Sequence, residues 1–237
     1  MIRTMTFLSR LNDFISPPVC PVCKERLFDS RWEICDDCRK QFPLLPEKRC
    51  PACGGPNDSI FAQCRHCLQQ EERPWVVAVS AFPFEGLARN AVHRLKFRKQ
   101  VILASFLSHC LADAWLKYSD GFRPDVIMPI PLHWWRRIRR GYNQAGLIAE
   151  NLGKRLQIPC AQFLVRTRKT EQQSTLDARH RLQNLKGAFA AVPEAKGHSI
   201  LLVDDVFTTG ATLTAAAQAL LKAKAHAVAV ITIARDL

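Results

Sequence analysis

Four C-x-x-C pairs within the first 67 residues constrain the fold of this 237-residue chain more than any other feature of its sequence. Two thiolates separated by two residues can reach one metal ion from a tight turn, and two such turns complete a tetrahedral zinc site with four sulfur ligands. The sequence therefore predicts two structural Zn²⁺ sites near its N-terminus. Their predicted ligands are Cys20, Cys23, Cys35, Cys38, Cys50, Cys53, Cys64 and Cys67.

A disulfide framework and a thiol redox centre are alternative interpretations of the cysteine pairs. Disulfides are typical of secreted proteins, but residues 1–16 carry Arg10 and Asp13 within their apolar part and lack the small-residue cleavage site of a signal peptide. Four repeated pairs also suit a structural role better than a single reactive dithiol. Pairing each C-x-x-C with its neighbour in sequence gives two stacked zinc ribbons, and a crossed pairing is also compatible with the sequence.

After residue 72 the hydrophobic pattern changes to strands that alternate with helices. Short apolar runs predict strands at 75–85, 125–132, 161–167, 199–206 and 227–234, and apolar spacings of three and four predict helices at 87–95, 101–118, 143–156 and 211–225. Pro83 favours an edge position for the first strand. This alternation is typical of an α/β fold with a mostly parallel sheet flanked by helices on both faces.

We therefore expect two domains. Residues 1–72 would form an N-terminal helix, on an apolar stripe at 7–15, followed by a double zinc ribbon. Residues 73–237 would form the α/β domain.

The stretch SILLVDDVFTTGAT, residues 199–212, places Asp204 and Asp205 at the carboxyl end of a buried strand. Ligands of open parallel sheets bind at this end, and carboxylates are costly to bury unless they meet hydroxyl groups or a metal ion. Thr208 and Thr209 supply hydroxyls, and Gly210 permits a tight turn that presents the free N–H groups of the next helix to a phosphate. The pattern predicts a site for a phosphorylated sugar.

An ordinary strand-to-helix turn is the alternative interpretation of this stretch. Capping, however, needs only one of these side chains. A P-loop is excluded because the chain contains no G-x-x-x-x-G-K-[ST] segment. The carboxylates, the threonines and the glycine are therefore interpreted together as one site.

The chain carries a formal charge of +13, which favours a polyanionic partner. Thirteen Lys and Arg stand against four Asp and Glu between Arg123 and Lys186. Within this segment, HWWRRIRRGYNQ at 133–144 interleaves arginines with aromatic residues, a composition suited to a groove that follows single-stranded DNA and stacks its bases. A solvated basic surface without a partner is the alternative for the charge. The alternative for the aromatic residues is that they anchor the core, since the adjacent Trp134 and Trp135 cannot both face the same way on a strand or helix.

These motifs together resemble a known family. LLVDDVFTTGAT at 201–212 resembles the phosphoribosyl pyrophosphate (PRPP) signature of type I phosphoribosyltransferases. The whole chain is similar to the ComF family (ComFC, GntX-like) of DNA-uptake and DNA-utilisation proteins. The similarity is carried by the cysteine pairs, HRLKFRKQ at 93–100, PIPLHWWRRIRRGYNQAGLIAENL at 129–152 and RTRKTEQQSTLDARHRLQNLKGAF at 166–189.

The resemblance implies roles for individual residues. Asp204 and Asp205 would bind the ribose hydroxyls of PRPP, directly or through Mg²⁺. The residues that would cradle the 5′-phosphate are Thr208, Thr209, Gly210, Ala211 and Thr212. The residues that would contact pyrophosphate or DNA are Arg136, Arg137, Arg139, Arg140, Tyr142 and Asn143. A second loop that matches the family pattern contains Arg166, Thr170, Gln173, Arg181 and Asn184.

Two functions follow from the resemblance. The first is a ComF-like protein of DNA uptake or utilisation in natural transformation, which binds PRPP and handles single-stranded DNA in the cytoplasm, with other components of the DNA-uptake machinery as further partners. No run of about 18 apolar residues occurs, so no membrane insertion is expected. The alternative is an active phosphoribosyltransferase that transfers the ribose 5-phosphate of PRPP to an unidentified nucleobase-like acceptor. The sequence identifies no catalytic residue and no element that selects a base.

Overall fold

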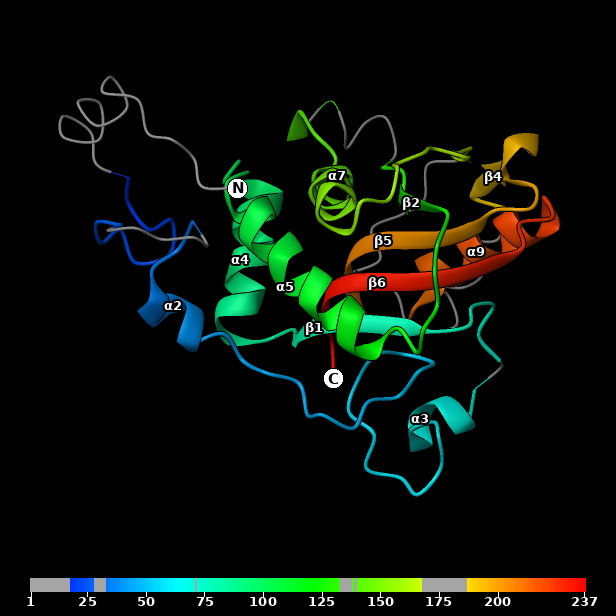
Figure 1. The fold of residues 1–237 in the computed structure, drawn as a ribbon, viewed down its shortest axis with the longest axis horizontal. Helices are drawn as coiled ribbons and strands as arrows, with labels where there is room; N and C mark the ends of the chain where they lie inside the picture. The colour runs from blue at the N-terminus through cyan, green and yellow to red at the C-terminus, as the bar shows by residue number, and fades with distance from the viewer. Residues whose placement is uncertain (1–17, 28–32, 71, 133–137, 139, 168–186) are drawn as a thin grey trace.

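The computed structural model of the chain describes residues 18–27, 33–70, 72–132, 138, 140–167 and 187–237 (Figure 1). Its centre is a parallel sheet whose strands span Ala78–Pro83 (β1), Val126–Pro129 (β2), Ser199–Phe207 (β5) and Ala227–Arg235 (β6). The strand order is β1, β6, β5, β2. The strands are mostly apolar and buried, as expected of a parallel sheet that is covered on both faces.

The helices that cover this sheet span Gly86–Phe97 (α4), Leu103–Tyr118 (α5), Gln144–Leu156 (α7) and Ala211–Lys222 (α9). Helices α4, α5 and α7 pack on one face, and α9 packs on the other (Figure 1). Successive strand residues point to opposite faces, so Leu201 and Val203 contact the first group of helices while Ile200 and Leu202 pack towards α9. Each strand therefore contributes to two apolar cores, and a shift of one residue would break both.

Two shorter strands, β3 (Leu164–Arg166) and β4 (Phe189–Ala191), pair antiparallel outside the main sheet. They lie beside α9. In β3 the side chain of Leu164 is buried and that of Val165 is exposed, in contrast to the continuous burial of the main strands. The pair is therefore a surface ladder. A 3₁₀ turn, η2 (Pro193–Ala195), follows β4.

The N-terminal cysteine pairs build two ribbons of the same design. An antiparallel bridge flanks the first cysteine pair of each ribbon. The residue after that pair has a left-handed backbone in both ribbons, with φ of 73° at Lys24 and 69° at Gly54. A short helix begins at the second pair, α2 (Asp36–Lys40) in the first ribbon and α3 (Arg65–Leu68) in the second.

Both ribbons are fastened to the α/β body by hydrogen bonds to their cysteine turns. Nη1 of Arg94, on α4, donates to the carbonyl oxygens of Pro21 at 2.7 Å and Val22 at 3.2 Å in the first ribbon. The backbone N–H of Ala78, on β1, donates to the carbonyl of Pro51 in the second ribbon at 2.7 Å. The two ribbons are therefore held on different elements of the same body.

The predicted fold class is confirmed: a parallel sheet with helices on both faces accompanies two N-terminal cysteine clusters. Strand β1 lies at an edge of the main sheet, as Pro83 predicted. The predicted helix at 7–15 lies outside the described residues, and the domain boundary after residue 72 stays a prediction. Within the described ranges, no helix combines the length and the apolar character needed to cross a bilayer.

Candidate functional site

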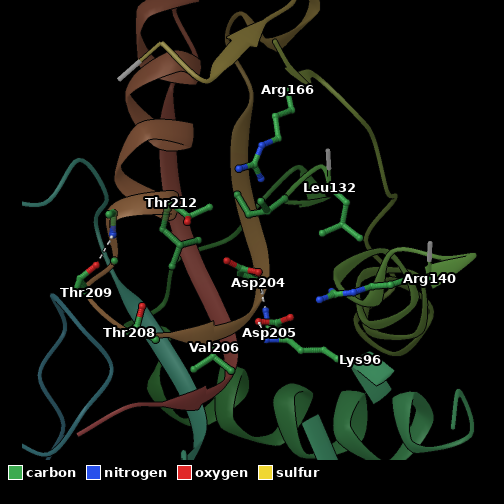
Figure 2. A pocket seen from close by; sticks show the side chains of 14 residues that line it. Lys96, Leu132, Arg140, Arg166, Asp204, Asp205, Val206, Thr208, Thr209 and Thr212 are labelled. Atoms are coloured by element: carbon green, nitrogen blue, oxygen red, sulfur yellow. Dashed lines mark hydrogen bonds and ion pairs between the residues drawn. The ribbon is translucent and has the colours of Figure 1, made fainter. Parts of the chain in front are cut away.

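A pocket of about 180 Å³ lies at the carboxyl end of β5, between the start of α9 and the end of α4 (Figure 2). Residues 208–213 line one side of this pocket, and the carboxylates of Asp204 and Asp205 lie in its middle. The lining also holds three basic side chains: Lys96 and Arg140 lie across the carboxylates from this turn, and Arg166 lies beyond Asp204. The pocket thus has the position at which open parallel sheets bind their ligands.

The turn at 208–212 connects β5 to α9 and depends on Gly210 for its shape. Gly210 has a φ of +79°, a left-handed conformation that glycine adopts readily and other residues rarely adopt. A Cβ atom at this position would lie 2.8 Å from Cζ of Phe207, so steric contact also excludes a larger residue. Helix α9 begins at Ala211. Because the first N–H groups of a helix lack intrahelical acceptors, this end of α9 can receive a phosphate.

Asp204 and Asp205 are neighbours on β5, and the pleat of the strand sends their side chains in different directions. Oδ1 of Asp205 forms an ion pair with Nζ of Lys96, on α4, at 2.8 Å. Oδ1 of Asp204 accepts the backbone N–H of Asp205 at 2.8 Å. Both side chains line the pocket because it lies beyond the carboxyl end of β5, where side chains from both faces of the strand can reach it (Figure 2).

Asp204 has an unusual protonation behaviour for a carboxylic acid. Burial in the pocket, together with the neighbouring charge of Asp205, raises the pKa of Asp204 to about 7. The N–H of Asp205 and the positive charges of Lys96 and Arg166 lower this pKa, but they offset only part of the burial effect. A ligand that brings hydroxyl donors or a cation to Asp204 would therefore favour its charged form.

The basic side chains of the pocket come from three separate elements. Lys96 lies in the last turn of α4, Arg140 lies shortly before α7, and Arg166 is the last residue of β3. The guanidinium of Arg140 donates to Oε1 of Gln144 at 3.0 Å and lies 5.1 Å from the ring centre of Phe97. Positive charge gathered beside a carboxylate pair suits a ligand that carries both phosphate groups and hydroxyls.

The structure brings the predicted PRPP-binding residues into one pocket: Asp204, Asp205, Thr208, Thr209, Gly210, Ala211 and Thr212, and with them Arg140. Tyr142 and Asn143 are not among the lining residues. The hydroxyl of Tyr142 donates to the carbonyl of Leu95, and Nδ2 of Asn143 donates to the carbonyl of Ile130 at 3.0 Å. These two bonds fasten the start of α7 to α4 and to the segment after β2. The other predicted contacts lie outside the described residues: Arg136, Arg137, Arg139, Thr170, Gln173, Arg181 and Asn184.

Sequence reasoning gave Lys96 no chemical role, and it named Arg166 only as part of the second family-patterned loop, in the place of the loop that covers the active site of transferases. Lys96 lies in the HRLKFRKQ segment, and its distance from Asp205 depends on how α4 packs on the sheet. The available signal for Arg166 was its position directly after the apolar residues of β3, where a short strand ends.

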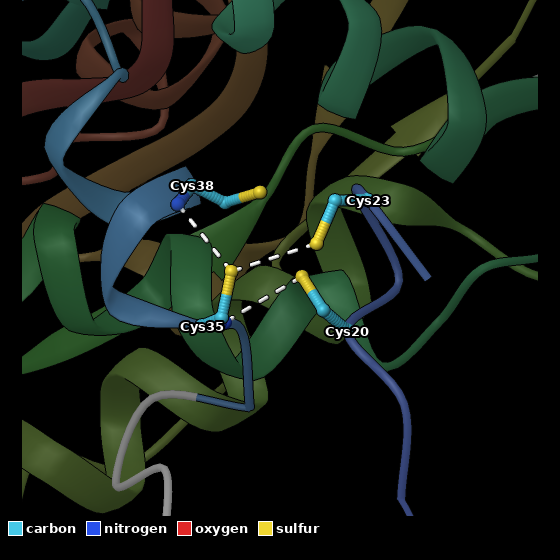
Figure 3. A group of neighbouring side chains, drawn as sticks. All are labelled: Cys20, Cys23, Cys35 and Cys38. Atoms are coloured by element: carbon cyan, nitrogen blue, oxygen red, sulfur yellow. Dashed lines mark hydrogen bonds between the residues drawn. The ribbon is translucent and has the colours of Figure 1, made fainter. Parts of the chain in front are cut away.

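The eight cysteines of the pairs gather into two clusters, and the grouping is sequential. Figure 3 shows the first cluster, Cys20, Cys23, Cys35 and Cys38. Within each cluster the four Sγ atoms lie within 4.8 Å of one another. The Sγ–Sγ distances of 3.6 Å between Cys23 and Cys35 and 3.9 Å between Cys53 and Cys64 are close to the value of about 3.8 Å for two sulfurs on one tetrahedral zinc ion. Backbone N–H groups of Cys35 and Cys64 each donate to a sulfur of the preceding pair. Both donor sets therefore fit zinc.

The second cluster is better shielded than the first. All four of its cysteines are buried, whereas in the first cluster Cys23 is exposed and Cys35 is half-buried. Hydrogen bonds from the thiols of Cys53 and Cys67 lower the pKa of Cys50, against the opposing effect of burial. A thiolate is thus favoured where a cation would bind.

The fold and the pocket define a phosphoribosyltransferase-type α/β domain joined to a double zinc ribbon. Residues 111–237 match the family model of the phosphoribosyl transferase domain, which includes both aspartates and the turn at 208–212. Residues 11–69 match the model of the double zinc ribbon domain, which includes all eight clustered cysteines.

The chain belongs to the ComF family of DNA-utilisation and competence proteins. It is 35% identical over 225 residues to DNA utilization protein YhgH of Escherichia coli strain K12, a match that covers 93% of this chain and 98% of the relative. It is 34% identical over 204 residues to competence protein F of Haemophilus influenzae, a match that covers 82% of this chain and 86% of the relative. It is 32% identical over 217 residues to competence protein ComFC of Bacillus subtilis, a match that covers 86% of this chain and 85% of the relative. These matches confirm the family resemblance of the motifs.

Proposed function

We propose that the pocket binds PRPP and that the protein handles single-stranded DNA during DNA uptake or utilisation in the cytoplasm. The observation that carries this proposal is the order of chemical groups across the pocket. A threonine-rich turn at a helix N-terminus lies on one side, two carboxylates lie in the middle and basic side chains lie on the other side. PRPP has a matching order: a 5-phosphate, two ribose hydroxyls and a 1-pyrophosphate.

Each part of PRPP then meets a group of suitable chemistry. The 5-phosphate accepts hydrogen bonds from N–H groups of the turn at 208–212, and the ribose hydroxyls donate to Asp204 and Asp205. The pyrophosphate lies beside Lys96, Arg140 and Arg166. Mg²⁺ is compatible with the same site, because carboxylate and phosphate oxygens are the ligands that it prefers.

The DNA part of the proposal rests on charge, on chain connectivity and on the relatives. The chain has an excess of 13 positive charges, and its relatives are named for DNA utilisation and competence. The basic and aromatic segment at 133–144 directly follows Leu132 and includes Arg140, and both of these residues line the pocket. A DNA strand on this segment would therefore bind near PRPP, and each ligand would alter the affinity of the other.

Calorimetric titration with PRPP tests the pocket. The double substitution Asp204→Ala with Asp205→Ala should weaken PRPP binding by at least about a hundredfold, because two charge-assisted hydrogen-bond acceptors are lost. Asp36→Ala with Asp37→Ala is the matched control, since these adjacent carboxylates are exposed on α2 and the change in charge is the same. Unchanged PRPP affinity in a folded Asp204/Asp205 variant would refute the assigned pocket.

Fluorescence anisotropy with labelled single strands tests the DNA part. Binding should weaken steeply as salt rises, because contacts to phosphates release counterions. PRPP should change the DNA affinity by the same factor by which DNA changes the PRPP affinity. Binding that is absent at low salt, or insensitive to salt, contradicts the proposal.

An active phosphoribosyltransferase is the second candidate function. The observation that favours it is the presence of Lys96, Arg140 and Arg166 in the pocket lining, because cations there would stabilise pyrophosphate as it leaves. Release of pyrophosphate from PRPP across a panel of nucleobases separates the two candidates. Turnover with one base supports the transferase, and tight PRPP binding without turnover supports the DNA-handling protein.

A further inference from the structure

Arg235, the last residue of β6, is buried behind the turn at 208–212 and does not line the pocket. Its Nη1 atom donates to the carbonyl oxygens of Phe207 at 3.0 Å and Thr208 at 2.6 Å, and also to that of Asp236. Its guanidinium lies 4.8 Å from the ring centre of Phe207. One cationic side chain therefore fixes two consecutive peptide groups at the entry to the turn.

The direction of these two carbonyls decides the direction of the next N–H groups. In a trans peptide the carbonyl of one residue and the N–H of the following residue point in opposite directions, and no described peptide bond is cis. Because the carbonyls of Phe207 and Thr208 point at Arg235, the N–H groups of Thr208 and Thr209 point away from it. Thr208 and Thr209 line the pocket on the side proposed for the 5-phosphate.

The second zinc ribbon packs against Arg235. Gly55 lies so close to it that a Cβ atom on Gly55 would be 3.3 Å from Cγ of Arg235 and 3.5 Å from Sγ of Cys53. The same ribbon is anchored to the sheet by the bond from Ala78 to Pro51 and by the indole of Trp75, whose Nε1 donates to the carbonyl of Ala52 at 2.9 Å. A continuous line of contacts thus runs from a zinc-binding turn through Arg235 to the turn at 208–212.

We propose that Arg235 is a positioning residue for the phosphate end of the ligand, and that the second ribbon holds it in place. Arg235 keeps the carbonyls at the entry of the turn away from the pocket, so that N–H groups and not carbonyl oxygens face the phosphate. This inference rests on the proposed function and extends it, because it makes the ribbon part of the apparatus that recognises phosphate.

Binding of the two halves of PRPP, measured separately by calorimetry, tests this inference. Arg235→Met should weaken the binding of ribose 5-phosphate roughly tenfold and leave the binding of pyrophosphate within about twofold. Arg235→Lys should recover part of the loss, because an ammonium group can still donate to one of the carbonyls. Arg94→Met is the matched control, since Arg94, on α4, also donates to two carbonyl oxygens, but these belong to the first ribbon and Arg94 does not line the pocket.

A second variant, at the contact between the ribbon and Arg235, tests the inference even if Arg235→Met fails to fold. Gly55→Ala should displace Arg235 by a few tenths of an ångström and weaken ribose 5-phosphate a few-fold, with two zinc ions per chain retained. Ribose 5-phosphate affinities equal to wild type in the folded variants would overturn the inference. Failure of the wild-type protein to bind PRPP, ribose 5-phosphate or pyrophosphate would instead overturn the proposed function, so the two failures are distinguishable.

Discussion

The ion pair between Lys96 and Asp205 sets the electrostatic balance of the pocket. It joins α4 to β5 at 2.8 Å, and only 23% and 17% of the two side-chain surfaces are exposed. Solvent screens such a pair less than it screens a pair on the open surface, so the attraction between the two charges is stronger. At the neighbouring Asp204 the effects that favour the neutral carboxyl prevail, because burial and the charge of Asp205 raise its pKa to about 7.

Lys96→Met should weaken PRPP binding roughly tenfold, because the pyrophosphate side of the pocket loses a cation. Pyrophosphate alone should lose affinity by a similar factor, and ribose 5-phosphate should lose much less. Calorimetric titration with the three ligands measures the difference. Lys117→Met removes a lysine from an exposed pair with Glu47, at 2.7 Å, and should leave all three affinities unchanged. Equal losses in both variants would argue against a pyrophosphate role for Lys96.

Asp204→Asn should stabilise the protein above neutral pH. The pKa of Asp204 is raised from an ordinary 3.8 to about 7, so between these values the folded state holds a proton that the unfolded state has lost. This group therefore makes the free energy of unfolding fall as pH rises from about 4 to about 7, and asparagine removes that fall.

Denaturant unfolding in magnesium-free buffer at pH 5 and pH 8 measures this effect. At pH 8 the variant should be more stable than wild type by on the order of 1 to 2 kcal/mol, and the gain should shrink at pH 5. Asp58→Asn, at an exposed position, controls for the change in net charge. A gain that does not depend on pH would contradict the assigned titration.

At the scale of elements, the sequence predicts those units whose residues lie close together along the chain. Both ends of the turn at 208–212 are close in sequence, and each cysteine cluster is assembled from neighbouring pairs, so these units could be predicted from spacing. The spacing left a crossed pairing of the cysteine pairs open, and the structure shows the sequential one. The antiparallel pairing of β3 with β4 could not, because it joins residues 164–166 to residues 189–191 across a long connection. Lys96 likewise reaches Asp205 only through the packing of α4 on the sheet, which no motif encodes.

The two cysteine clusters should release zinc at different rates. Cys23 is exposed, whereas the second cluster is buried throughout, so a chelator reaches the first site more easily. Zinc release followed with a chromogenic indicator should show a fast phase and a slow phase of equal amplitude. Cys23→Ser should remove the fast phase and keep the slow one. A single phase, or a fast phase that survives in Cys23→Ser, would contradict this assignment.

At the scale of the whole molecule, the ribbons are built into the phosphoribosyltransferase-type body and are not attached by one linker alone. The first ribbon contacts α4 through Arg94, and the second contacts β1 and Arg235. The sequence predicted both modules and their order, but not these contacts, because docking depends on surfaces that form only after each module folds. The first ribbon contacts α4 and the second contacts β6, and residues of both elements help to shape the pocket.

The most direct test of the proposed PRPP pocket is a crystal structure of the protein with PRPP bound. The account predicts the 5-phosphate on the N–H groups of the turn at 208–212, the ribose hydroxyls at Asp204 and Asp205, and the pyrophosphate beside Lys96 and Arg166. PRPP bound in the reverse direction, or bound at a different surface, would contradict it.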